Sequence, residues 1–85
     1  MEYRFKQGDV IMAFMHTLNL LGLNCPIPQI KTKQALNQLP FGDFLKVWVS
    51  TYPCFESIIQ ISNSLGYTII SSGQISNYYE IVIKK

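Results

Sequence analysis

Charged side chains are scarce in this chain of 85 residues. They make up 14% of the sequence, and the formal net charge of +2 is too small to indicate a dedicated nucleic-acid-binding protein. Hydrophobic residues make up 48%, which argues against disorder, and the length suits one domain with a single modest core. The apolar run at residues 10–15 is too short to span a membrane.

Cysteine is also rare. The two cysteines, Cys25 and Cys54, can form one disulfide but not a disulfide framework, and no secretory signal peptide precedes them. We therefore expect a cytoplasmic protein in which Cys25 stays a free thiol. The only histidine, His16, and two distant cysteines make a poor zinc site, so no metal is expected. A strand-edge histidine is favoured over a catalytic Cys–His pair.

Cys25 stands in the most informative segment, Gly-Leu-Asn-Cys-Pro-Ile-Pro at residues 22–28, between an apolar run and a helix-like segment. Pro26 and Pro28 fix the backbone that leaves the cysteine, and proline suits the first turn of a helix. Unpaired N–H groups and the positive end of the helix dipole favour a thiolate at such a position. The segment predicts a sulfur nucleophile. The alternative is an inert, half-buried thiol at a helix cap.

The pattern of apolar residues predicts the element order β-α-β-α-β-β, with strict alternation along the strand at 44–50 and one apolar stripe along each helix, the second of which ends at Leu65. The expected elements are a strand over 16–20, a helix over 28–39, a strand over 44–50, a helix over 53–65 closed by Gly66, and strands over 67–71 and 78–84 joined by a turn at 73–77. Strands that alternate with helices pair in parallel through right-handed crossovers, so both helices should cover one face of the sheet. Both helices then start at one edge, with Cys25 and Cys54 at those starts.

Cys54 has three interpretations. The favoured one is a small apolar residue that packs beside Phe55. The alternatives are a resolving thiol for Cys25 and a second relay site, because the topology lets the two cysteines approach each other. A disulfide would require Cα atoms within about 7 Å.

The face of the sheet opposite the helices carries much apolar surface, contributed by Phe44, Trp48, Tyr78 and Val82. We expect either that the first fifteen residues pack on this face or that a homodimer buries it. An equally weighted alternative is that the natural start is Met12 or Met15 and that the preceding residues are a poorly ordered leader.

The segment from Leu18 to Pro28 resembles the signature of the TusA/SirA/YedF family of small sulfur-carrier proteins. The likeness extends over residues 16–85 and includes the turn at residues 40–43 and the final hairpin. It implies an α+β fold, a two-layer sandwich of two helices on a mixed four-stranded sheet. Residues 1–15 are then an N-terminal extension and residues 16–85 the family domain, in which Gly22, Pro26 and Pro28 are motif residues.

The resemblance also implies a function. A cysteine desulfurase would charge Cys25 with persulfide sulfur, and a downstream acceptor protein would remove it for tRNA thiolation or related sulfur trafficking. Such a protein is a carrier rather than a turnover enzyme on its own. It needs no metal or organic cofactor, and neither direct nucleic-acid nor membrane binding is expected. Charges common in the family are absent here at Asn19, Leu21, Asn24 and Ile27.

Ile27 and Ile30 lie off the buried stripe of the first helix and flank the motif. With Lys31 and Lys33 they could form an apolar docking surface with a basic rim, suited to a partner with acidic groups. The alternative is an ordinary solvated helix face. The runner-up function is a non-catalytic regulatory or adaptor module that uses this surface. A third, a small RNA-binding domain, would require a basic stripe with stacking aromatic side chains.

Overall fold

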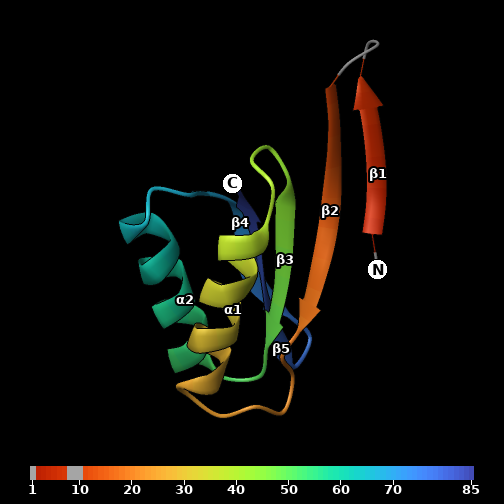
Figure 1. Ribbon diagram of the computed structural model, residues 1–85. Coiled ribbons are helices and arrows are strands. Elements are labelled where there is room, and N and C mark those ends of the chain that lie inside the picture. The colour runs from red at the N-terminus through yellow and green to blue at the C-terminus, as the bar shows by residue number, and fades with distance from the viewer. Residues whose placement is uncertain (1, 8–10) are drawn as a thin grey trace.

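The computed structural model describes the backbone of residues 2–7 and 11–85 and the side chains from residue 14 onward. Two helices cover one face of a mixed sheet, which gives two layers (Figure 1). The elements are β1 (Glu2–Gln7), β2 (Ile11–Asn19), α1 (Ile27–Gln38), β3 (Phe44–Val49), α2 (Tyr52–Ser64), β4 (Thr68–Ile75) and β5 (Tyr78–Lys84). Among the described residues, neither helix is long and apolar enough to cross a membrane.

The sheet has the strand order β1-β2-β3-β5-β4. β2 and β3 are parallel, with α1 as the crossover between them, and the other neighbours are antiparallel. The predicted two-layer sandwich and the order β-α-β-α-β-β are confirmed from β2 onward. β1 adds a fifth strand within the predicted N-terminal extension, and β2 begins five residues before the predicted strand.

β1 extends the edge of the sheet rather than lying across its open face (Figure 1). The predicted contacts of the extension's side chains with that face lie outside the described residues. The cross-strand register places Phe44, Trp48 and Val82 on the open face, as predicted. Trp48 packs edge-on against Tyr78 and donates a hydrogen bond of 3.0 Å from Nε1 to Glu80 Oε2. Neighbouring strands therefore half-bury these aromatic rings, and burial by a homodimer stays a prediction.

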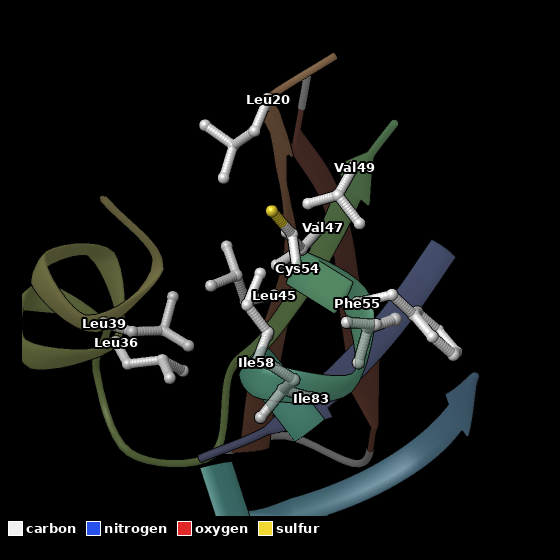
Figure 2. Packing of buried hydrophobic residues seen from close by; sticks show 11 residues of the cluster. Leu20, Leu36, Leu39, Leu45, Val47, Val49, Cys54, Phe55, Ile58 and Ile83 are labelled. Atoms are coloured by element: carbon white, nitrogen blue, oxygen red, sulfur yellow. The ribbon is translucent and has the colours of Figure 1, made fainter. Parts of the chain in front are cut away.

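The core lies between the helices and the sheet (Figure 2). It consists of Leu20, Leu36, Leu39, Leu45, Val47, Val49, Cys54, Phe55, Ile58, Ile81 and Ile83. The alternation predicted for β3 is confirmed, because its buried and half-buried residues follow one another strictly. The apolar stripes predicted for both helices are also confirmed, except that Leu65 is 44% exposed. Leu65 is the C-cap residue of α2 and follows the last turn that packs on the sheet.

The β4–β5 hairpin is longer than predicted. Residues 73–75, which were expected to form a turn, continue β4 and pair with β5. Only Ser76 and Asn77 remain in the loop, and Ser76 has a positive φ of 56°. Gly73 is compatible with a strand here because β4 is the last strand of the sheet, where an edge position demands less of the side chain.

Gly66 ends α2 as the sequence predicted. Its φ is +86°, its N–H donates to Asn63 O at 3.1 Å, and the N–H of Tyr67 donates to Ser62 O at 3.0 Å. These two bonds form a Schellman motif, which satisfies carbonyls that the helix end would leave unpaired.

We predict that Gly66→Ala lowers the free energy of unfolding by about 1 kcal/mol, because a Cβ disfavours the left-handed conformation. Gly73→Ala is the matched control. A Cβ at either glycine would meet no atom within 4 Å, but only Gly66 has a positive φ. Gly73→Ala should therefore be neutral or stabilising in urea unfolding of the two variants and the parent. Equal losses of stability in both variants would contradict the assignment.

Candidate functional site

The chain leaves β2 through a tight turn that leads to Cys25. Leu20 N–H donates to Trp48 O at 2.9 Å, which continues the parallel pairing, and Leu23 N–H closes the turn on Leu20 O at 3.3 Å. Gly22 occupies the third position of this turn with a φ of +84°, a conformation that suits glycine. Its N–H donates to Ser50 Oγ at 2.7 Å. This hydrogen bond connects the turn before Cys25 to Ser50, the residue that follows β3.

Cys25 immediately precedes α1, whose N-cap is Pro26. Pro28 is the second helical residue, is buried, and has no N–H to leave unpaired. Ile27 N–H donates to Asn24 O at 3.0 Å, and Ile30 N–H donates to Pro26 O at 3.2 Å. The motif prolines therefore start the helix directly after the cysteine, and Cys25 itself is exposed to solvent.

Cys54 lies in the first turn of α2. Thr51 is the N-cap of this helix, Pro53 is the second helical residue and Cys54 the third. The Cys54 side chain points into the core beside Val47 and is 1% exposed (Figure 2). The two helices begin at the same edge of the sheet because β2 and β3, which precede them, are parallel.

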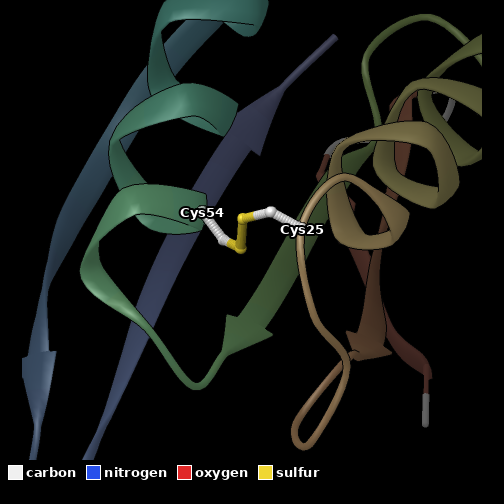
Figure 3. Close-up of a disulfide and its surroundings, with 2 residues drawn as sticks. All are labelled: Cys25 and Cys54. Atoms are coloured by element: carbon white, nitrogen blue, oxygen red, sulfur yellow. A yellow bond between two sulfur atoms is a disulfide. The ribbon is translucent and has the colours of Figure 1, made fainter.

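A disulfide joins Cys25 to Cys54, and their Cα atoms are 5.9 Å apart (Figure 3). This separation is typical of disulfides. The expectation that Cys25 stays a free thiol is therefore wrong for this structure. It rested on the expected reducing compartment, whereas the shared edge of the helices brings the two cysteines within bonding distance. Cys54 is buried in the core, as its favoured interpretation requires, and is also within bonding distance of Cys25.

The backbone contributes to the electrostatic surroundings of the two sulfur atoms. Neither helix has an acidic residue in its first turn, so no side chain there offsets the partial positive charge of the helix N-termini. Cys25 precedes one N-terminus and is bonded to a residue in the first turn of the other. After reduction, both dipoles would favour a thiolate on Cys25.

Exposed apolar side chains lie in the turn before Cys25 and in the first turns of both helices. The predicted docking residues all lie on the solvent side of α1: Ile27 is 45% exposed, Ile30 is 52% exposed, and Lys31 and Lys33 are exposed on either side of them. Two further residues, missed by the sequence analysis, extend the apolar surface. Leu21, 39% exposed, lies in the turn before Cys25, and Tyr52, 52% exposed, is the first residue of α2.

Tyr52 could have been noticed from its position just before Pro53 and Cys54. Its ring lies 5.8 Å from that of Phe55 and 5.9 Å from that of Tyr79, so its place beside the cysteines is fixed by packing. Leu21 gave no distinct signal, because it continues the apolar run of β2. We call Leu21, Ile27, Ile30 and Tyr52 the apolar rim.

His16 takes no part in this site. Its Nε2 lies 3.0 Å from Asp43 Oδ2, and Asp43 also accepts a hydrogen bond of 3.2 Å from Phe14 N–H. His16 also lines a hollow of about 270 Å³ beside the C-terminal half of α1, whereas Cys25 precedes the other end of that helix. His16 is therefore a strand residue, as the sequence favoured, and its contact with Asp43 connects β2 to the residue before β3.

Comparison with known proteins points to one family. The family model described as Sulfurtransferase TusA matches residues 16–85. Two curated relatives carry the name "Putative sulfur carrier protein". The one from Methanocaldococcus jannaschii is 37% identical over 84% of this chain and 95% of its own length, and the one from Thermotoga maritima is 30% identical over 80% and 87%.

A solved structure has the same fold. The crystal structure of a SirA-like protein from Desulfitobacterium hafniense superposes with a TM-score of 0.71 at 27% sequence identity, over 81% of this chain and 93% of that one. The family model, the curated relatives and the fold point to the same family. The chain belongs to the TusA sulfurtransferase family.

Proposed function

We propose that this protein is a cytoplasmic sulfur carrier that holds sulfane sulfur as a persulfide on Cys25. The observation that carries the proposal is the position of Cys25. It is exposed, it lies directly before α1, and it is next to the first turn of α2. Helix N-termini favour the thiolate, which is the form of cysteine that attacks sulfur.

The donor in this proposal is a cysteine desulfurase, and the transfer is an exchange at sulfur. The Cys25 thiolate attacks the outer sulfur of the donor persulfide, and the bond between the donor's two sulfur atoms breaks. The donor cysteine leaves as a thiolate with the electron pair of that bond. Since the attack needs a free Cys25, the disulfide form must first be reduced before the protein accepts sulfur.

Discharge follows the same chemistry. A thiolate of an acceptor protein attacks the outer sulfur of the Cys25 persulfide, and Cys25 leaves as a thiolate. The acceptor's product then serves tRNA thiolation or a related use of sulfur. Both partners must bring a sulfur atom to the same exposed edge, so the apolar rim is the surface on which each would dock.

The proposal predicts which atom accepts the sulfur. Reduced Cys54→Ser protein, which has no second thiol that could attack the added sulfur, should gain the mass of one sulfur atom on the peptide that contains Cys25 when it is incubated with a cysteine desulfurase and cysteine, whereas Cys25→Ala should gain none. Intact-protein and peptide mass spectrometry measure both. A Cys25→Ala variant that gains the same mass would refute the assignment, and one that leaves partner binding and phenotype intact would favour the adaptor alternative.

The proposal also predicts where the sulfur donor docks. Ile30→Ser should lower the rate constant for sulfur transfer from the desulfurase, at limiting carrier concentration, about tenfold. Losing part of the burial of an isoleucine side chain costs about 1.4 kcal/mol. Ile70→Ser is the matched control, because Ile70 is 51% exposed against 52% for Ile30 but lies on β4.

Lys33→Glu tests, in the same assay, whether the exposed lysines of α1 contribute to docking. If the partner is acidic, the charge reversal should slow transfer at low salt, and added salt should reduce the difference from wild type. In the isoleucine experiment, equal transfer rates for Ile30→Ser and Ile70→Ser would show that α1 is not the docking surface.

A further inference from the structure

The two bonded cysteines differ sharply in exposure. Cys25 is open to solvent in the loop before α1, whereas Cys54 is 1% exposed within the first turn of α2 (Figure 3). A partner can therefore reach Cys25 from outside, while Cys54 approaches the same sulfur atom from the side of the core. In this geometry the sulfur of a partner protein and the thiol of Cys54 can both reach Sγ of Cys25.

We propose that Cys54 resolves the Cys25 persulfide and releases its outer sulfur as hydrosulfide, leaving the disulfide found in the structure. This inference rests on the proposed function, because it requires a persulfide on Cys25. It gives the protein a second outlet. Sulfur that no acceptor removes leaves as inorganic sulfide, and the disulfide is the state after release.

The reaction balances without an added oxidant. Cys54 loses its proton, and its thiolate attacks Sγ of Cys25 and forms the new S–S bond. The bond between Sγ and the outer sulfur breaks, and its electron pair leaves with the outer sulfur, which takes up a proton. The sulfane sulfur is reduced by two electrons, and the two cysteines are oxidised to the disulfide. A cellular dithiol then reduces the disulfide by exchange and restores both thiols.

The position of Cys54 favours release over a second relay step. Its sulfur is bonded to Sγ of Cys25, so Sγ is the atom within its reach. A persulfide's outer sulfur would lie one bond farther out, and a partner must be able to reach it from the solvent. Attack by Cys54 on Sγ expels the outer sulfur, whereas attack on the outer sulfur would transfer it to Cys54.

Cys54 also has the means to act as a nucleophile. Burial opposes its ionisation, but its place as the third residue of α2 puts it at the positive end of that helix. The fold also holds it beside its target, which raises its effective concentration far above that of a dissolved thiol. A small thiolate fraction is therefore sufficient.

A single-turnover experiment tests this proposal. Reduced protein, freed of added thiols under anaerobic conditions, is incubated with a catalytic amount of cysteine desulfurase and one equivalent of cysteine. Wild type should release about one equivalent of hydrosulfide and lose the mass of two hydrogen atoms as the disulfide forms. Cys54→Ser and Cys54→Ala should instead keep the mass of one added sulfur on Cys25 and release little hydrosulfide. Cys25→Ser, the background control, should do neither.

The outcomes separate the two proposals. A wild-type protein that keeps the added sulfur on Cys25 overturns resolution by Cys54 but supports the carrier function, and added sulfur mapped to Cys54 overturns release in favour of relay. If neither wild type nor the Cys54 variants gain sulfur or release it, the carrier function itself fails. Disulfide formation at the same rate without cysteine would show simple oxidation and would also overturn resolution. Because the wild-type masses decide the question, a poorly folded Cys54 variant cannot obscure it.

Discussion

Both helices begin at one edge of the sheet because β2 and β3 run parallel and each is followed by a helix. This arrangement brings together two cysteines that are 29 residues apart in sequence, with their Cα atoms 5.9 Å from each other. It also directs two helix N-termini at the same sulfur atoms, where no acidic first-turn residue offsets them. The strand order therefore sets the position of the two thiols and places them at helix N-termini, which favour the thiolate.

The surface around the site has more apolar than charged character. The apolar rim lies in the turn before Cys25 and in the first turns of α1 and α2, and Lys31 and Lys33 are the only charged residues of α1. A surface of this kind recognises a partner mainly through burial of apolar area, while the lysines contribute to steering and register.

Much of this could be predicted from the sequence, because local patterns determine it. The alternation in β3, the stripes of both helices and the glycine after α2 are each set by residues a few positions apart. The meeting of Cys25 and Cys54 at one edge also followed from topology, but the bond between them did not, because it depends on distances that periodicity leaves free. The place of residues 2–7 could not be predicted either, since pairing with β2 at the sheet edge depends on register with a distant segment. The hairpin loop was misplaced because Gly73 resembles a turn residue, although it occupies an edge strand.

The most direct test of this account is the rate of alkylation of each cysteine in the reduced protein, measured against pH and resolved by peptide mass spectrometry. We expect Cys25 to be labelled rapidly, with an apparent pKa below that of an ordinary cysteine thiol, because it is exposed and lies at two helix N-termini. Cys54 should resist labelling until the protein unfolds, because it is buried. Equal labelling of both cysteines in the folded protein, or a Cys25 that titrates like an ordinary thiol, would contradict the account.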